Sequence, residues 1–288
     1  MTKPQPLTFG IQILPLGSWL DLLDEWGRYG GQGWDSRWLP DHLMPPSGEA
    51  GPILEGWMAL AALAPLTERA RIGILVSSNT FRHPSVLAKQ AVTVDHISGG
   101  RLILGLGAGW YEAEHQAFGI ELPETGTRVS QFAESLDLLD QFLSNDTTTY
   151  SGDWYRLRDA PNRPAPIHAP RMPIMVGAHG PRTIGIAARH ADIWNSRGDV
   201  DEMRERNARM DAACERAGRD PSEVTRSISY FPVRTTQRPW ASIDAFASWV
   251  ETYRAIGYTD FIFDAPPPEH RDIAERIAQE LLPELRRG

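Results

Sequence analysis

Short strand-like segments alternate along the chain with stretches whose apolar residues recur every three or four positions. Short apolar runs bounded by turn-forming residues are typical of buried strands, and the longer spacing is typical of amphipathic helices. The pattern predicts eight strands, at 7–14, 34–40, 70–78, 101–107, 172–178, 191–196, 225–234 and 258–265. It also predicts eight helices, at 18–33, 54–67, 84–97, 128–143, 181–190, 199–218, 242–257 and 269–287.

Strict alternation of strands and helices implies a parallel sheet with helical crossovers. Eight repeats in 288 residues favour a closed α/β barrel, a (β/α)8 TIM barrel, over an open doubly wound sheet. We expect residues 1–288 to form a single domain. The alternation stops between about 145 and 170, where prolines and aromatic residues follow each other without a clear period. We therefore expect an irregular insertion there, after the fourth helix, and a functional role for it.

The charge and composition of the chain exclude several classes of binding partner and covalent feature. The net charge is −8, which argues against a general surface for nucleic acid or for an anionic membrane. Lysine occurs only at Lys3 and Lys89, so an anion site would use arginine or backbone N–H groups. Cys214 is the one cysteine, which leaves no intrachain disulfide. The N-terminus lacks the features of a signal peptide, and no stretch reaches the ~18–20 apolar residues of a membrane span, so we expect a cytoplasmic protein.

In a barrel of this type the active site lies at the carboxyl ends of the strands. Those ends carry glycines, small hydroxyls, amides and aromatic residues: Gln12, Asp41, His42, 77–79, 107–110, 177–180, Asn195, 230–231 and Asp264. The chain has no G-x-S-x-G, no H-E-x-x-H and no Walker lysine, and its histidines do not have metal-ligand spacing, so no metal is expected. This composition is typical of a site that holds a flat cofactor against backbone atoms.

Each of two glycine-rich stretches has two possible structural roles. Gly105, Gly107 and Gly109 miss the dinucleotide pattern G-x-G-x-x-G because Trp110 takes the place of the third glycine. These glycines either leave room for a ring or relieve crowding at a barrel corner. The stretch 177–183, GAHGPRT, is either an anion site at a helix start or a plain turn.

Asp41 and His42 follow the second strand directly. An imidazole titrates near neutrality, so the pair is suited to general acid–base work. The alternative is a capping aspartate beside a packed histidine. In an extended exit from the strand the two side chains diverge, so we expect at most one of them to face the centre of the pocket.

The run 82–110, RHPSVLAKQAVTVDHISGGRLILGLGAGW, closely resembles the luciferase-like monooxygenase superfamily, in particular its branch that depends on the deazaflavin coenzyme F420. The stretches 38–43, 155–167 and 172–195 resemble further blocks of that family in the same order. The resemblance implies a (β/α)8 barrel with an insertion. It also implies a reduced flavin or deazaflavin at the strand ends, with hydride transfer or flavin-dependent oxygenation as the chemistry.

Carried over by position, the resemblance implies a role for individual residues. Asp41 would contact the ring system, and His42 would lie near its reacting face. Residues Leu75, Val76 and Ser77 would form a bulge behind the ring, with a non-prolyl cis peptide at Leu75–Val76, and Asn79 at the same strand end would also bind the cofactor. The ring and its polyol chain would lie on Gly107, Ala108 and Gly109. The phosphate would be held by Gly177, Ala178, His179, Gly180 and Arg182.

Trp110 is a departure from part of the family. Relatives that oxidise sugar phosphates carry a glutamate directly after the G-x-G of the fourth strand. With Trp110 there, we expect Trp110 and Gln12 to contact an apolar or aromatic substrate rather than a sugar phosphate. The acid–base role then falls to His42, with Glu114 as the second candidate.

We therefore expect an F420-dependent oxidoreductase that moves a hydride between C5 of the deazaflavin and a small organic substrate. The first alternative is a two-component monooxygenase that uses reduced FMN, supplied by a partner reductase, and oxygen. A barrel that binds a flavin without chemistry is the second. F420 has a longer anionic tail than FMN, so a rim arginine such as Arg82 would favour it. The family also suggests a homodimer.

Overall fold

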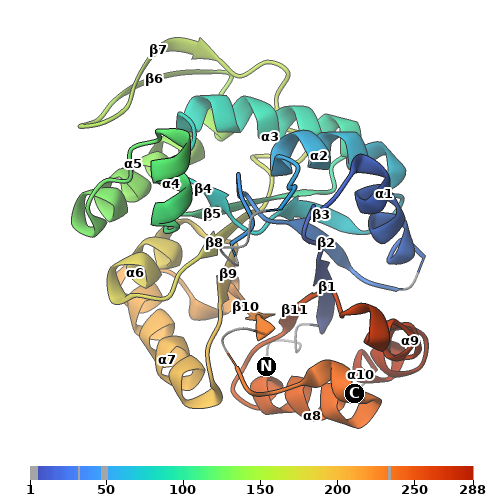
Figure 1. The fold of residues 1–288 in the computed structure, drawn as a ribbon. Coiled ribbons are helices and arrows are strands. Elements are labelled where there is room, and N and C mark those ends of the chain that lie inside the picture. The colour runs from blue at the N-terminus through green and yellow to red at the C-terminus, as the bar shows by residue number, and fades with distance from the viewer. Residues whose placement is uncertain (1–5, 32, 47–50, 233–234, 288) are drawn as a thin grey trace.

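The computed structural model describes residues 6–31, 33–46, 51–232 and 235–287. Eight parallel strands surround one axis, and the helices form a ring outside them (Figure 1). The barrel strands are β1 Thr8–Gln12, β2 Ser36–Leu39, β3 Arg71–Ile74, β5 Leu102–Gly107, β8 Ile174–Gly177, β9 Ile193–Ser196, β10 Thr225–Tyr230 and β11 Asp260–Asp264. Strand β1 pairs with β2 and β11, and β3 pairs with β5, so the sheet closes. The predicted barrel is confirmed.

The outer ring contains the eight predicted helical regions, the last of them divided into two helices, and one additional helix. Their bounds are α1 Trp19–Arg28, α2 Gly56–Leu63, α3 Pro84–Ser98, α4 Glu112–Phe118, α5 Thr125–Ser144, α6 Pro181–His190, α7 Val200–Arg216, α8 Ile243–Arg254, α9 Arg271–Arg276 and α10 Leu282–Leu285. Local signals fix several ends: Ser18 and Asp21 form a capping box before α1, and Gly99 ends α3 with a φ of 68°. The distal ends of two predicted elements, at 32 and 233–234, lie outside the described residues.

The apolar core has two parts. The larger part fills the space between the strands and the surrounding helices. A smaller cluster of Trp38, Ile103, Met175 and Ile262 comes from four different strands and fills the barrel interior. Inward side chains close a barrel of this size, so it is a packed core with a site on top rather than a pore.

The predicted strand 70–78 is interrupted. β3 ends at Ile74, and a two-residue strand, β4 Ser77–Ser78, resumes the pairing with β5. Between them the peptide bond Leu75–Val76 is cis, as the family resemblance implied. The chain therefore bulges at this point of the barrel rim.

The segment 145–170 is not irregular throughout, as we expected. It contains an antiparallel hairpin of β6 Thr147–Ser151 and β7 Arg156–Pro161, which projects outside the ring near α3 and α5 (Figure 1). Most residues of both strands are polar and exposed, so the sequence shows little of the apolar–polar alternation that marks a half-buried strand. The carboxylate of Glu134 on α5 accepts hydrogen bonds from the backbone N–H groups of 153–155, which holds the hairpin turn.

Two helical regions also differ from the prediction. Helix α4 lies in a stretch where none was expected, so the hairpin follows the fifth observed helix. The predicted helix 269–287 is split into α9, a π-helical segment Ile277–Leu281 and α10. Pro283 has no backbone N–H to donate, and the wider turn lies directly before it.

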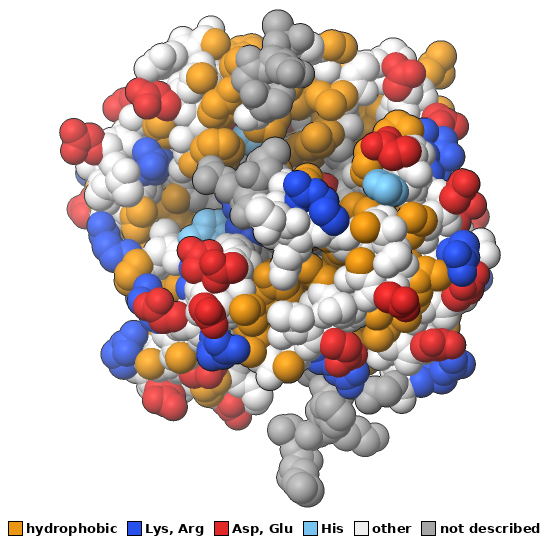
Figure 2. All heavy atoms as spheres, turned by 60° about the horizontal axis from the view of Figure 1, so that its bottom comes forward, with side chains coloured by type: hydrophobic (Ala, Val, Ile, Leu, Met, Phe, Trp, Pro, Cys, Tyr) orange, Lys and Arg blue, Asp and Glu red, His pale blue; other side chains and the backbone are white. Residues whose placement is uncertain are grey.

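Charged side chains of both signs are interspersed with hydrophobic ones over the face in Figure 2, including near its middle. This face has no extended basic patch of the kind that nucleic acids require. Among the described residues, no helix is long and apolar enough to cross a membrane.

Candidate active site

A cavity of about 630 Å³ opens at the carboxyl ends of the strands, and all eight barrel strands or the residues directly after them contribute to its wall. This volume falls within the range of roughly 300–1,000 Å³ that is usual for small-molecule sites. The wall includes all but two of the predicted site residues: Gln12, Asp41, His42, Leu75, Val76, Ser77, Gly107, Ala108, Gly109, Trp110, Glu114, Gly177, His179, Gly180 and Arg182.

Asn79 and Ala178 are the two exceptions. The Asn79 side chain turns away from the cavity and donates a hydrogen bond to the hydroxyl of Tyr155 in the hairpin, at 3.2 Å. Ala178 is 1% exposed, and its carbonyl accepts a hydrogen bond from Trp194. Neither residue belongs to the cavity wall, so their contact with a cofactor stays a prediction.

Glycines at the ends of β5 and β8 leave room for the bulge at Leu75–Val76. A Cβ on Gly107 would lie 2.6 Å from Cγ2 of Val76, and a Cβ on Gly177 would lie 3.1 Å from the same atom. A Cβ on Gly105 would lie 1.9 Å from the carbonyl oxygen of Ile74. Crowding at the barrel corner therefore accounts for Gly105, while Gly107 and Gly177 both accommodate Val76 and line the cavity.

His42 and Glu114 form a hydrogen-bonded pair across 72 positions of sequence. Nδ1 of His42 lies 3.0 Å from Oε1 of Glu114, and the other carboxylate oxygen accepts a hydrogen bond from the backbone N–H of Leu43. The Glu114 side chain is 2% exposed, so the pair is shielded from bulk water. A carboxylate can only accept, so Nδ1 carries the proton and Nε2 is the free acceptor of a neutral ring. Glu114 reaches His42 from the unpredicted helix α4.

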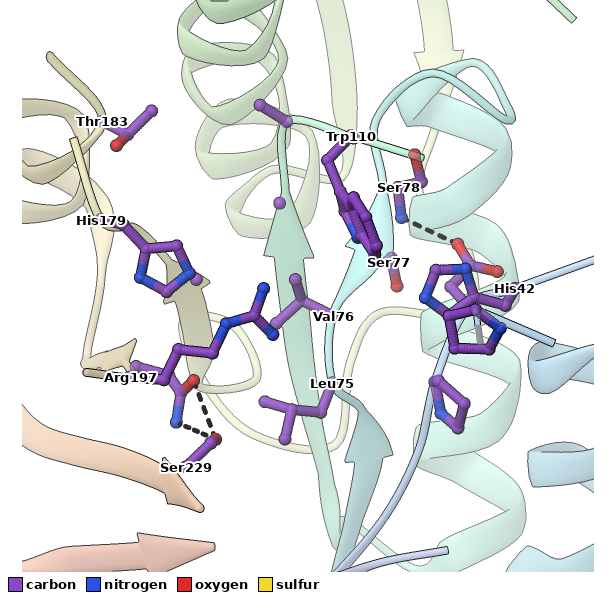
Figure 3. A pocket seen from close by; sticks show the side chains of 18 of the residues that line it. His42, Leu75, Val76, Ser77, Ser78, Trp110, His179, Thr183, Arg197 and Ser229 are labelled. Atoms are coloured by element: carbon purple, nitrogen blue, oxygen red, sulfur yellow. Dashed lines mark hydrogen bonds between the residues drawn. The ribbon is translucent and has the colours of Figure 1, made fainter. Parts of the chain in front are cut away.

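The aromatic neighbours of His42 fix its plane further. The rings of Trp110 and Tyr111 meet it edge-on, with centroids 5.9 and 6.0 Å away. Figure 3 shows His42 and Trp110 on the side of the cavity that also holds Ser77 and Ser78. The imidazole is thus held by a carboxylate at one edge and by aromatic rings at its sides.

Asp41 also lines the cavity, so both members of the pair reach its wall. Its carboxylate accepts two hydrogen bonds from the Arg82 guanidinium, at 2.7 and 3.0 Å, and one from the backbone N–H of Ser78. Arg82 also contacts Glu55 at 3.2 Å and is absent from the cavity wall. The expectation that Arg82 meets an anionic tail was therefore wrong, because two carboxylates already balance its charge.

Asp264 and Arg197 are wall residues to which sequence reasoning assigned no role. Burial raises the pKa of Asp264 to about 7, and the nearby Arg197 opposes that shift. The Arg197 guanidinium lies over the ring of Phe231 at 4.9 Å and extends toward Val76 in Figure 3. Asp264 could have been found from its place at a strand end, but its burial could not; Arg197 follows β9 without any motif.

The start of helix α6 lies on the side of the cavity opposite His42 (Figure 3). Gly180 precedes the helix, Pro181 and Arg182 are its first residues, and Thr183 completes the turn. The Arg182 guanidinium donates to the Gly126 carbonyl at 3.3 Å and to the Ser130 hydroxyl at 3.0 Å, which orients it beside the cavity. Free N–H groups at a helix start, an oriented guanidinium and the nearby Arg128 suit an anion such as a phosphate.

Residues 31–280 match the family described as luciferase-like monooxygenase. The F420-dependent glucose-6-phosphate dehydrogenase of Microbacterium testaceum is 27% identical over 306 residues, which cover 88% of this chain and 90% of that protein.

Two solved structures share the fold at 17% identity. The coenzyme F420-dependent tetrahydromethanopterin reductase from Methanopyrus kandleri superposes with a TM-score of 0.82, covering 98% of this chain and 100% of that one. An F420-dependent secondary alcohol dehydrogenase in complex with an F420–acetone adduct superposes with a TM-score of 0.83, covering 95% and 98%. Because the family match spans most of the chain, the protein belongs to the luciferase-like monooxygenase family and is an enzyme of its F420- or flavin-dependent oxidoreductases.

Proposed function

We propose that the protein is an F420-dependent oxidoreductase that transfers a hydride between the deazaflavin and a small organic substrate. The observation that carries this proposal is the His42–Glu114 pair, which lies in the same cavity as the anion-binding start of α6. One end of the cavity is therefore suited to a phosphate and the other to moving a proton. The F420 dependence of the Microbacterium testaceum relative supports F420 over FMN.

The chain's own residues fit such a cofactor. Gly107 and Gly177 present backbone rather than side chains to the cavity, so a flat ring can approach closely. The start of α6 and Arg182 would hold the phosphate, and Arg128 would add positive charge along an anionic tail. When bound, the deazaflavin would supply the hydride acceptor or donor.

His42 would handle the proton that accompanies the hydride. Its Nδ1–H donates to Glu114, so Nε2 can take the proton of a substrate hydroxyl as the carbon-bound hydride leaves. In the reverse direction the protonated ring would return that proton to a carbonyl oxygen. The buried Glu114 carboxylate would orient the ring in both directions.

The substrate that this wall supports is a small apolar or aromatic molecule rather than a sugar phosphate. Trp110 is 51% exposed, and Leu14 and Phe231 add apolar surface to the same wall. Asp264 would repel a second phosphate whenever it is ionised. The carboxylate of this site comes from Glu114, four residues after the position that carries glutamate in sugar-phosphate relatives.

The test mixes purified protein with F420 and a panel of small alcohols that includes benzyl alcohol and glucose 6-phosphate. We expect reduction of F420, seen as loss of its visible absorbance, with at least one neutral alcohol and a far lower rate with glucose 6-phosphate. His42→Ala is the matched control and should bind F420 but not reduce it. Consumption of oxygen with reduced FMN, without any hydride transfer to F420, would support the monooxygenase alternative instead.

A further inference from the structure

A chain of hydrogen bonds runs from His115, the residue after Glu114, to the cavity wall. Nδ1 of His115 lies 2.7 Å from the carbonyl oxygen of Tyr111, and Nε2 lies 2.7 Å from Oγ1 of Thr80. Oγ1 of Thr80 in turn lies 2.7 Å from Oγ of Ser78. Ser78 lines the cavity, whereas Thr80 and His115 do not. The chain thus connects a buried imidazole to one hydroxyl at the site.

The direction of each bond follows from its acceptor. A carbonyl oxygen can only accept, so the proton on His115 is at Nδ1. Phe81 packs against the ring at 5.1 Å, and no carboxylate of the described chain makes an ion pair with it. In the neutral imidazole, with its proton at Nδ1, Nε2 carries a lone pair. Nε2 is then an acceptor, and the Thr80 hydroxyl donates to it. The Thr80 hydroxyl has a single O–H, which it donates to His115, so the Ser78 hydroxyl must donate to Thr80.

Because its O–H is used in this way, the Ser78 hydroxyl can only accept hydrogen bonds from groups in the cavity. Its position is fixed as well, because its backbone N–H donates to Asp41 at 2.8 Å (Figure 3). Gly109 makes the arrangement possible: a Cβ there would lie 2.7 Å from Oγ1 of Thr80 and 2.8 Å from Oγ of Ser78. Gly109 also has a φ of 84°, which an L side chain rarely adopts.

We propose that His115 is a positioning residue which, through Thr80, makes Ser78 a dedicated hydrogen-bond acceptor for an N–H or hydroxyl group of the bound cofactor. This inference rests on the proposed function, since a deazaflavin or flavin carries such donors on its ring imide and its polyol chain. A hydroxyl free to rotate would present a proton to the cavity part of the time. Helix α4 then serves the site twice, because Glu114 orients His42 and the next residue orients Ser78.

The test is a binding experiment that does not depend on turnover. F420 is titrated into wild type, Ser78→Ala, Thr80→Val, His115→Phe and the double variant Ser78→Ala/Thr80→Val, following tryptophan quenching. Each single variant should weaken binding by about 3- to 10-fold, the worth of one net hydrogen bond. Thr80→Ser retains the hydroxyl and should bind like wild type. Thr93→Val, the same replacement on the exposed face of α3, is the matched control and should leave binding unchanged.

The double variant distinguishes a Thr80 that acts through Ser78 from one that acts independently. If Thr80 acts through Ser78, the double variant binds no more weakly than Ser78→Ala alone. Losses that multiply in the double variant, or a Thr80→Val variant with wild-type affinity and an unchanged melting temperature, overturn the inference. Should wild type bind FMN but not F420, the proposed function fails, and the same cycle with FMN decides the inference separately. Binding of neither cofactor overturns both.

Discussion

Asp264 gives a measurable link between the cavity and the stability of the fold. Its carboxyl lies at the end of β11 in the cavity wall, and burial raises its pKa from 3.8 to about 7. Replacement by asparagine removes the ionisation and keeps the shape of the side chain. We expect this variant to lose a distinct part of the pH dependence of unfolding.

The sign follows from proton binding in the two states. Between the unfolded pKa near 3.8 and the folded value of about 7, the folded protein holds a proton that the unfolded chain has released. Unfolding then releases protons, so the stability that this group contributes is complete below the unfolded pKa and is lost as pH rises toward the folded one. With ~1.4 kcal/mol per pKa unit, the loss between about pH 5 and pH 8 is on the order of 2 kcal/mol.

The assay is denaturant unfolding of wild type and Asp264→Asn at both pH values, followed by tryptophan fluorescence. The free energy of unfolding of wild type should fall by on the order of 2 kcal/mol more than that of the variant over this interval. Asp272→Asn, on the exposed start of α9, is the matched control and should follow wild type. Parallel pH profiles for wild type and Asp264→Asn would show that the carboxyl is not desolvated as described.

Three further predictions concern the cavity. His42→Ala should lower kcat by roughly 10²- to 10⁴-fold and leave F420 affinity nearly unchanged, and equal losses in both would contradict a proton-transfer role. Gly107→Ala should weaken F420 binding because its Cβ displaces Val76, and adding Val76→Ala should restore part of the affinity; an additive effect would refute this coupling. Arg182→Gln should weaken F420 binding by about 5- to 10-fold at low salt and less at high salt, whereas a salt-independent loss would argue against an ionic contact.

Elements with a strong local signal were predictable from the sequence. Helix α6 begins at Pro181 and ends at His190 as expected, because a glycine and a proline mark its start and its apolar positions repeat with helical spacing. The eight barrel strands were found because each is a short apolar run bounded by turn-forming residues. The β6–β7 hairpin was missed because only Tyr150, Leu157 and Ala160 of its residues pack against the core, which is too few apolar positions to mark two strands in the sequence.

The site was predictable as a set of strand ends but not as a set of contacts. Glu114 was a secondary candidate in the sequence, and only the fold brings it to His42 across the rim. The reason for Gly107 was equally out of reach, because it depends on where Val76 lies after the cis peptide. Arg82 was misread because its partners, Asp41 and Glu55, come from distant parts of the chain.

The central claim is that this cavity binds a deazaflavin whose ring lies beside His42 and whose phosphate lies at the start of α6. The most direct measurement is a parallel titration of the purified protein with F420 and with FMN, following tryptophan quenching. The claim predicts saturable binding of F420 that is tighter than that of FMN and is weakened by Arg182→Gln. Tight binding of FMN with no response to F420 would contradict it.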